Sequence, residues 1–528
     1  MLRRVACFFL ILIATAAAAV ASELPVIPRP THVKVGRGVF RSGPDLKVNA
    51  DPATLAAVKR AVEADGGPRV ASSPRNRARV HLAIEIDLAD QLGEEGYQLS
   101  VTRGAIEARA ATEAGLFYAV QTLRQLSWAG GGSGEWVVPC CEVRDKPRFA
   151  WRGFMLDESR NFSGPDAVKR LLDAMALLKL NRFHWHLTDD TAWRIEIRQF
   201  PRLTEVGAVT PPTLADLVVR PKFYTRAQVR DIVAYARDRG ILVIPEINMP
   251  GHADASNRAY PEHSGGGSRT RPAFTLNPAS EATFQYLNTI LREVAGMFPD
   301  AGMLHLGGDE VSEGWQKWPE LPEVKDLMAR EGIKDLTGVE AYFKRRMAFF
   351  VDSLGMKAGF WMGGAEQSLP PELATLFWWR HTAHKELRAA LDGGYPVVLC
   401  PRLPCYFDFG QDSSHMAGAR WLGRLFFNTL PSVYAFPDSL PSSLSGHAGV
   451  LGIQANLWTE TAFTQERRDF LTFPRLLALA EAAWTPAARK DYAAFEERLR
   501  VHLPRLREAG IAPWDPFEKT PEATRTGQ

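Results

Sequence analysis

The sequence predicts an α/β protein in which a (β/α)8 TIM barrel follows a small α+β domain. From Arg152 onward, short apolar runs alternate with amphipathic helices or long loops. Eight such runs are typical of a barrel rather than of an open doubly wound sheet. Residues 24 to about 145 instead combine short β-like runs with one helix. The chain of 528 residues is long enough for both units.

The N-terminal unit has β-like runs at residues 80–86 and 97–102 and a helix at 114–126. Residues 139–147, which have a proline at each end, indicate the junction with the barrel. The expected domain boundaries are 1–21 for a signal peptide, 22–147 for the α+β domain, 148–510 for the barrel and 511–528 for a C-terminal tail.

The barrel strands are predicted from short apolar runs. They lie at residues 153–157, 181–187, 241–247, 303–307, 357–362, 374–379, 396–400 and 452–457. Helices are expected between them, for instance at 166–180, 226–239, 279–298, 336–354 and 470–483. Periodicity alone does not separate a short buried strand from a buried helix, so the strand count depends on the alternation.

The first 21 residues have the three parts of a secretory signal. Arg3 and Arg4 precede an apolar run at residues 5–13, and an alanine-rich stretch ends at residues 19–21. A membrane anchor is the alternative, but a spanning helix needs about 20 continuous apolar residues, and the small residues favour cleavage. We expect cleavage after Ala21, no stable membrane anchor, and a periplasmic or secreted protein.

Composition excludes several other classes. The hydrophobic share of 46% and the charged share of 23% are those of a globular protein, not of a disordered or coiled-coil chain. Arg3 and Arg4 contribute most of the net charge of +3, which leaves no basic surplus for nucleic acid. Cys7 lies in the signal, and the other cysteines are too few for a disulfide framework and suggest no zinc site. These are Cys140, Cys141, Cys400 and Cys405, and a bridge between the last two stays open.

Polar side chains gather at the ends of the first four predicted barrel strands. The carboxyl ends of barrel strands carry the functional site. The residues there are Asp157, Glu158 and Arg160; His184, His186, Asp189 and Asp190; Glu246, Asn248 and His252; and His305, Asp309 and Glu310.

Asp309 and Glu310 are adjacent carboxylates that follow two glycines. If the chain leaves strand geometry there, both side chains can approach one substrate. Like charges this close raise the pKa of one carboxyl, and a carboxylic acid still protonated near neutrality can act as a general acid. The alternatives are a solvated acidic turn or a helix N-terminus.

His184 and His186 indicate a competing chemistry. Alternate strand residues share a face, so both imidazoles are able to bind a metal with His252 or Asp309 as further ligands. The alternative is that these histidines hydrogen-bond nearby carboxylates within the barrel wall. Few single histidines follow the later strands, which argues against the metal site.

Five ordered strings resemble those of the exo-acting β-N-acetylhexosaminidases of glycoside hydrolase family twenty. They are Arg152-Gly-Phe-Met-Leu-Asp157 with Arg160; His184-Trp-His-Leu-Thr-Asp189-Asp190 with Trp193-Arg194; Pro245-Glu246-Ile-Asn-Met-Pro-Gly-His252; His305-Leu-Gly-Gly-Asp309-Glu310; and Gln454-Ala-Asn-Leu-Trp458-Thr-Glu460. The N-terminal part, with Gly96-Tyr97 and residues 115–126, is similar to the α+β domain that precedes the barrel in this family. The resemblance therefore covers nearly the whole chain.

The resemblance implies a retaining glycosidase whose substrate supplies the nucleophile. Glu310 would be the general acid and base, and Asp309 would orient the 2-acetamido group and stabilise an oxazolinium intermediate. No metal or other cofactor is implied. The expected substrate is an oligosaccharide or glycoconjugate with a terminal β-linked N-acetylglucosamine or N-acetylgalactosamine.

Further substrate-binding residues are implied by matching motif positions. Arg160 resembles a bidentate clamp on the 3- and 4-hydroxyls, and Asp189 and His252 resemble a pair near the reacting centre. The remaining polar positions would hydrogen-bond the acetamido oxygen and hydroxyls; they are Tyr406, Asp408 and Glu460. For Asp408 the alternative is an ordinary loop acid.

The 14 tryptophans leave room for a site that stacks on sugar rings. By resemblance, Trp361, Trp379 and Trp458 would enclose the acetamido methyl and support the ring. For Trp151 and Trp484 we expect core packing.

Two departures from the family pattern concern the side of the leaving group. Trp361 is not followed closely by an acid, because Met-Gly-Gly-Ala precedes Glu366. Residues 434–437 lack the aromatic and acidic pair expected near the leaving group.

Two other function classes stay open: a metal-dependent barrel hydrolase acting on the amide of an amino sugar, and a glycan-binding protein without catalysis.

Overall fold

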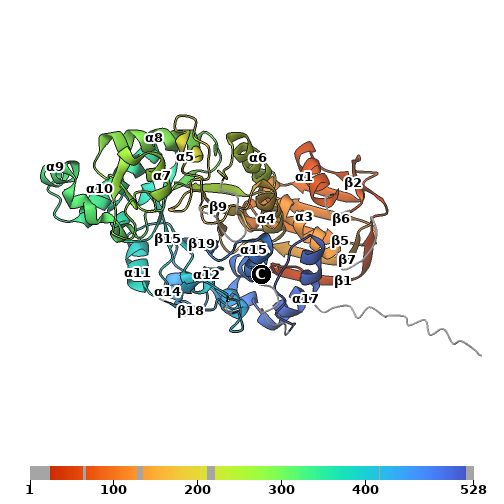
Figure 1. The fold of residues 1–528 in the computed structure, drawn as a ribbon. Coiled ribbons are helices and arrows are strands. Elements are labelled where there is room, and N and C mark those ends of the chain that lie inside the picture. Colours follow the sequence, from red (N-terminus) through yellow and green to blue (C-terminus); the bar gives the residue numbers. More distant parts are fainter. Residues whose placement is uncertain are drawn as a thin grey trace, which may run out of the picture.

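The computed structural model describes residues 24–63, 67–127, 135–210, 220–415, 417–421 and 423–518. The predicted signal and residues 519–528 of the predicted tail lie outside the described residues. Figure 1 shows a sheet unit, coloured red to orange, beside a barrel unit that makes up the rest of the chain.

The N-terminal unit is a seven-stranded sheet in the order β1-β7-β5-β6-β4-β2-β3. Its strands are β1 (His32–Arg41), β2 (Asp45–Asn49), β3 (Arg69–Ser72), β4 (Val80–Ile84), β5 (Tyr97–Val101), β6 (Ile106–Ala110) and β7 (Val137–Asp145), and its helices are α1 (Pro52–Glu63), α2 (Ala89–Leu92) and α3 (Glu113–Ser127). Alternate residues of β5 and β6 are buried against one core, which α3 shares. The predicted strands at 80–86 and 97–102 and the helix at 114–126 are confirmed as β4, β5 and α3.

The segment predicted as the junction is for the most part a strand. β7 pairs antiparallel with β1 and with β5, so residues up to Asp145 belong to the sheet. Residues 139–147 were expected to form the junction because a proline stands at each end. The first of these, Pro139, cannot donate to a sheet ladder. It faces Val39 next to an irregularity in the β1–β7 register, where a missing N–H is tolerated.

The barrel is closed by eight parallel strands in the order β10-β13-β14-β15-β16-β19-β8-β9. They are β8 (Trp151–Asp157), β9 (Arg182–His186), β10 (Leu242–Glu246), β13 (Met303–His305), β14 (Lys357–Trp361), β15 (Ala374–Trp378), β16 (Val397–Leu399) and β19 (Val450–Leu457). Each predicted apolar run corresponds to one of these strands. β8 and β15 are buried along their whole length, as expected for parallel strands covered on both faces.

Helices surround the barrel, and four predicted ones are confirmed. These are α4 (Pro165–Leu177), α6 (Arg226–Arg237), α8 (Glu281–Ala295) and α10 (Leu336–Ser353). The single helix predicted at 470–483 is wrong, because α15 (Gln465–Thr472) ends before Pro474 and α16 (Arg475–Trp484) begins after it. Proline lacks the N–H that a continuous helix needs there.

The remaining elements lie in the loops and at the C-terminal end. They are α5 (Arg202–Glu205), α7 (Asp254–Ala259), α9 (Pro322–Glu331), α11 (His384–Asp392), α12 (Arg402–Cys405), α13 (Leu430–Ala435), α14 (Ser442–Ser445) and α17 (Tyr492–Glu508), with the strand pairs β11 (Ser264–Gly266) and β12 (Thr275–Leu276), and β17 (Arg420–Trp421) and β18 (Arg424–Leu425). Within the described part of the chain, we find no helix with the length and apolarity needed to cross a membrane.

Buried polar contacts join the two units. Trp484 packs into the N-terminal core and its Nε1 donates to Asp145 Oδ1 at 2.9 Å. Lys179 Nζ lies 3.1 Å from the other oxygen of Asp145. The core packing expected for Trp151 and Trp484 is confirmed by their burial in apolar clusters.

Candidate active site

The predicted functional residues meet at the carboxyl ends of the barrel strands. In the strand register, Asp157 of β8 lies beside His186 of β9, and His186 lies beside Glu246 of β10. Glu246 in turn lies beside His305 of β13. The sequence places polar residues at the last position of four neighbouring strands, and the closed barrel turns them into one buried layer.

Asp309 and Glu310 follow β13 after a backbone turn that leaves strand geometry. Gly307 and Gly308 have φ of 66° and 80°, and Glu310 itself has φ of 52°. A Cβ at Gly307 would overlap the Asn248 side chain, so only glycine fits. A non-glycine residue at positive φ costs about 1–3 kcal/mol and is typical of functional sites. The turn brings both carboxylates to one place.

His252 connects this pair to a deeper carboxylate. Its Nε2 lies 3.8 Å from Asp309 Oδ2 and 3.6 Å from Glu310 Oε2, too far for a direct hydrogen bond. Its Nδ1 lies 3.0 Å from Asp189 Oδ1 and 3.2 Å from Asp190 Oδ2. Although burial disfavours the charged ring, Asp189 and Asp309 raise the pKa of His252 well above its usual value. The structure thus brings Asp189 and His252 together behind the carboxylate pair.

The two adjacent carboxyls have different environments. Burial raises the pKa of Asp309 to about 6 despite the attraction of His252, and the charge of Glu310 adds to the rise. The His252 imidazole lowers the pKa of Glu310, and Arg271 and Arg402 act in the same direction. One raised pKa was predicted for this pair, and it belongs to Asp309.

Arg160 is surrounded by acidic groups. Its Nη2 lies 2.9 Å from Asp189 Oδ2, and its Nε lies 3.7 Å from Glu460 Oε1. Asp157 is a third neighbour at 3.4 Å, and the guanidinium also lies 5.1 Å from the centre of the Trp458 ring. These contacts fix the guanidinium at the mouth of the barrel, and half of the Glu460 side chain remains exposed.

Aromatic side chains line the same end of the barrel. The Trp361 and Trp458 rings are 5.9 Å apart, and Tyr406 lies 6.0 Å from Trp458. Trp379 belongs to the same buried cluster and donates through Nε1 to Met362 O at 3.1 Å. Aromatic faces are suited to the apolar faces of sugar rings.

Two buried polar atoms of this wall have no hydrogen-bond partner among the described residues. They are Trp458 Nε1 and Asp408 Oδ1. Burial, followed by the charge of Glu460, raises the pKa of Asp408 well above its usual value. A ligand bound at this end of the barrel is able to supply a partner for each of them.

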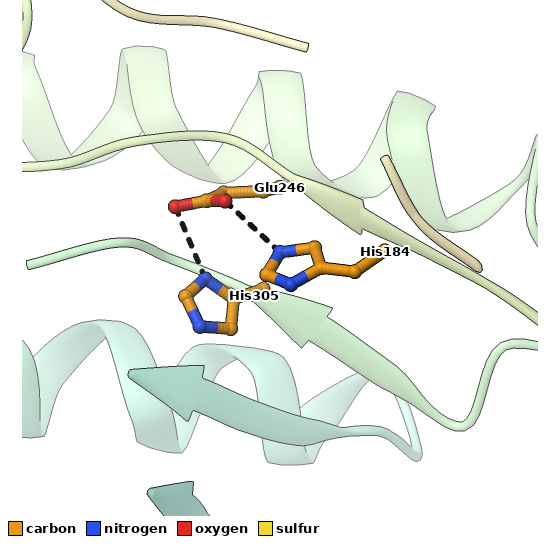
Figure 2. A group of neighbouring side chains, drawn as sticks. All are labelled: His184, Glu246 and His305. Atoms are coloured by element: carbon orange, nitrogen blue, oxygen red, sulfur yellow. Dashed lines mark ion pairs between the residues drawn. The ribbon is translucent and has the colours of Figure 1, made fainter. Parts of the chain in front are cut away.

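The metal grouping considered for His184 and His186 is not formed. His186 directs both ring nitrogens to carboxylates, with Nδ1 2.6 Å from Glu246 Oε2 and Nε2 2.9 Å from Asp189 Oδ2. His184 lies with Glu246 and His305 inside the barrel (Figure 2). Within the described ranges, neither of the two groups with ligand-like spacing contains both histidines or Asp309. The structure supports the alternative, in which these histidines contact carboxylates within the barrel.

The two departures from the family pattern have structural explanations. Glu366 is fully buried, accepts the backbone N–H groups of Gly363 and Gly364, and lies 3.2 Å from Lys344 Nζ. Lys344 also donates to Gly308 O at 2.7 Å, so this ion pair supports the turn before Asp309. In the other segment, residues 434–437, the Tyr434 hydroxyl donates to Glu481 of α16 at 3.0 Å.

Sequence reasoning missed three contributors to the site. It assigned no role to Lys344, Arg271 or Arg402, and no local motif marks them. The sequence named Glu246 and His305 only as polar strand ends, although their position at the last residue of a strand was the available signal. The cysteines predicted to remain after the signal are free in the described chain, including Cys400 and Cys405.

The chain forms a closed (β/α)8 barrel. Its carboxyl end has two adjacent carboxylates, the Arg160 guanidinium and aromatic walls. These features are those of a glycoside hydrolase barrel. The chain belongs to glycosyl hydrolase family 20: the catalytic-domain model of this family matches residues 149–487, and its domain 2 model matches residues 23–146.

Individual relatives agree with this membership. The chain is 38% identical over 454 residues to a beta-hexosaminidase of Porphyromonas gingivalis, covering 83% of this chain and 57% of the relative. It is 33% identical over 480 residues to a beta-hexosaminidase of Vibrio furnissii, covering 87% and 76%. A solved exo beta-N-acetylglucosaminidase of Vibrio harveyi, in complex with N-acetylglucosamine, superposes with a TM-score of 0.84 at 30% identity, covering 94% of this chain and 79% of the other. The chain thus spans little more than half the length of the Porphyromonas relative.

Proposed function

We propose that this protein is an exo-β-N-acetylhexosaminidase that removes terminal, non-reducing β-linked N-acetylglucosamine or N-acetylgalactosamine with retention of configuration. One observation carries the proposal: in a chain of family 20, Asp309 and Glu310 lie together at the barrel mouth with His252 between them and Asp189. The names of the relatives and the sugar bound to the Vibrio harveyi structure support the same substrate class.

In the first step, Glu310 donates its proton to the glycosidic oxygen. The bond between that oxygen and the anomeric carbon breaks, and the acetamido carbonyl oxygen of the same sugar bonds to the anomeric carbon. The product of this step is an oxazolinium ion and a free leaving group. Because the substrate supplies the nucleophile, no separate nucleophilic carboxylate is required.

Asp309 accepts the acetamido N–H and faces the positive charge that develops on the oxazolinium. That hydrogen bond favours the ionised form of Asp309, whereas the bound sugar removes water from Glu310 and raises its pKa. Substrate binding therefore places the proton of the pair on Glu310 and leaves Asp309 ionised. In the second step Glu310 takes a proton from water as the water attacks the anomeric carbon. The bond between that carbon and the acetamido oxygen breaks, which restores the acetamido group and releases the free sugar.

The remaining site residues hold the sugar. Arg160 and Glu460 bind ring hydroxyls from the barrel mouth, where Glu460 is half exposed. Asp408 and Tyr406 bind a hydroxyl and the acetamido oxygen. Trp361, Trp379 and Trp458 enclose the acetamido methyl and the ring face.

A single assay separates this proposal from the two other function classes. A chromogenic β-N-acetylglucosaminide is offered with and without a chelator, beside the matching β-glucoside that lacks the acetamido group. We expect turnover of the first substrate alone, unchanged by chelator. Loss of activity with chelator and its return with zinc would favour a metal-dependent hydrolase, and binding without turnover would favour a glycan-binding protein.

We also propose that the protein is exported, with residues 1–21 removed as a signal. The charged, apolar and small-residue segments of that stretch support this. Cell fractionation followed by N-terminal sequencing of the mature protein tests it, with a start at Ser22 as the expected result. Recovery from the cytoplasm with an intact N-terminus would contradict it.

A further inference from the structure

Glu246 is a buried carboxylate with four ring nitrogens within 3.2 Å of its oxygens. Oε2 accepts from His186 Nδ1 at 2.6 Å, and Oε1 accepts from Trp361 Nε1 at 2.7 Å. Two further nitrogens approach at angles outside the hydrogen-bond range: His184 Nε2 lies 2.9 Å from Oε2, and His305 Nδ1 lies 3.2 Å from Oε1 (Figure 2). His305 Nδ1 instead accepts the Gly307 N–H at 3.2 Å. Each oxygen of Glu246 therefore accepts one hydrogen bond and has one further imidazole beside it.

From Glu246, a line of alternating charges runs to the catalytic pair. His186 joins Glu246 to Asp189, with its Nε2 2.9 Å from Asp189 Oδ2. Asp189 Oδ1 lies 3.0 Å from His252 Nδ1, and the far nitrogen of His252 faces Glu310. Every side chain between Glu246 and His252 is at most 5% exposed, so water screens these charges little.

His186 is charged because of the acids around it. Burial disfavours a charged ring, but Glu246 and Asp189 together raise the pKa of His186 to about 10. His184 is neutral, because burial and the neighbouring His305 lower its pKa to about 4. His186, which contacts Asp189, is therefore protonated, and His184, which does not, is neutral.

We propose that Glu246 is a positioning residue that holds the His186–Asp189–His252 line in its oriented, charged form beneath the catalytic pair. The inference rests on the proposed function, since its main readout is turnover. Glu246 touches neither substrate nor reacting atoms and acts through His186. Groups that orient the ligands of a reacting centre typically change activity by about 10- to 100-fold when they are replaced.

The surroundings of His186 determine what a change of charge at Glu246 does. Titratable and charged groups surround Glu246, His186 and the line that continues through Asp189 to His252. They are Asp157 at the end of β8 and Arg160 after it; His184, Asp189 and Asp190 of β9 and its loop; His252 after β10; His305 and Asp309 of β13 and its loop; and Cys400 after β16. The Trp458 ring closes the remaining side at 4.9 Å. With Glu246 neutral, Asp189 is the only acid left in contact with His186 among the described residues.

The test is the pH profile of kcat for Glu246→Gln, an isosteric change that removes the charge. In the unchanged protein, His186 keeps its proton throughout pH 5–8. In the variant, the pKa of His186 falls, so the ring loses its proton as the pH rises. We expect kcat close to the parent at pH 5 and a further loss of about 10- to 100-fold by pH 8. A loss by one constant factor at every pH would overturn the proposal.

Two control variants separate this effect from a structural one. Glu481→Gln changes another fully buried glutamate, which pairs with Arg498 far from the site, and is expected to add no pH dependence. Trp361→Phe removes the indole donor from the opposite oxygen of Glu246 and is expected to leave the shape of the pH profile intact, whatever it does to KM. If the kcat of Trp361→Phe also falls as the pH rises to 8, the loss seen in Glu246→Gln does not pass through His186.

A measurement on the unmodified protein needs neither activity nor a variant that folds. The ring nitrogens of histidine are followed by ¹⁵N NMR from pH 5 to 8, and His186 is assigned through its contact with the Trp458 ring. We expect His186 to stay charged and His184 to stay neutral over this range. A His186 that titrates near its ordinary pKa of about 6.5 would overturn the proposal. This result is independent of whether the protein cleaves N-acetylhexosaminides.

Discussion

Asp189 Oδ1 lies 3.0 Å from His252 Nδ1, and this contact turns the other nitrogen of the ring toward Glu310. The backbone of the two residues that face each other here is unusual, because His252 and Glu310 both have positive φ, at 51° and 52°. Two strained residues that face one another indicate that the site is built for reaction rather than for stability.

Asp189→Asn is expected to lower kcat by roughly 10- to 100-fold, because the side chain keeps its shape but loses its charge. Asp189 raises the pKa of His252, so the variant should lose activity most at alkaline pH, where His252 then gives up its proton. Steady-state kinetics at pH 5 and pH 8 checks this. Asp438→Asn is the matched control, since Asp438 pairs with Arg148 and Lys490 away from the site. Equal losses at both pH values would contradict the argument.

Glu310→Gln is expected to preserve the fold while lowering turnover of a natural disaccharide by about 10²- to 10⁴-fold, the usual contribution of a general acid. A substrate whose leaving group needs no proton should lose much less. Glu313→Gln is the control, because Glu313 is on the next turn and half exposed. Full activity of the Glu310 variant on the disaccharide would show that the acid is another residue.

The barrel was predictable because each strand leaves a separate apolar run, and no long-range information is needed to recognise eight of them. The helix at 470–483 was predicted wrongly because the apolar period continues through Pro474, and backbone chemistry overrides that period. The segment predicted as the junction overlaps the end of β7, since an irregular register accommodates Pro139 inside that strand.

The carboxylate pair was visible because Asp309 and Glu310 are adjacent in sequence. The environment that sets their pKa values was visible only in part. His252 was expected near the pair, but Arg271 and Arg402 come from distant segments that no local motif marks. Lys344 was invisible for a similar reason: it reaches Gly308 O from the middle of α10. A helix interior has no local signal for a side chain that supports a distant turn.

Gly307→Ala is expected to disrupt the site, because a Cβ there meets two penalties. A positive φ of 66° costs an L-residue about 1–2 kcal/mol, and the new carbon overlaps the Asn248 side chain. Gly302→Ala is a matched control with φ of 64° and no atom within 4 Å. Both variants should lose stability in thermal unfolding, and only Gly307→Ala should also lose most of its turnover. Equal turnover in the two variants would show that the turn before Asp309 tolerates displacement.

Asp309→Asn is expected to make the protein more stable and less active. The pKa of Asp309 is about 6 in the folded protein, above its ordinary value of 3.8, so the folded state holds this proton more tightly than the unfolded state does. Its ionisation therefore destabilises the fold, and stability is lost as the pH rises from about 4 to about 6. A shift of this size corresponds to about 3 kcal/mol.

Asparagine escapes this penalty because it cannot ionise. Thermal unfolding should show the Asp309 variant above its parent in Tm at pH 7.5 and level with it at pH 4. In the same variant, turnover of an N-acetylated substrate should fall on the order of 10²-fold, because a neutral amide stabilises the developing cation less than a carboxylate does. A variant that loses activity without gaining stability at pH 7.5 would mean that Asp309 is ionised at no cost to the fold, and that the raised pKa belongs to its neighbour.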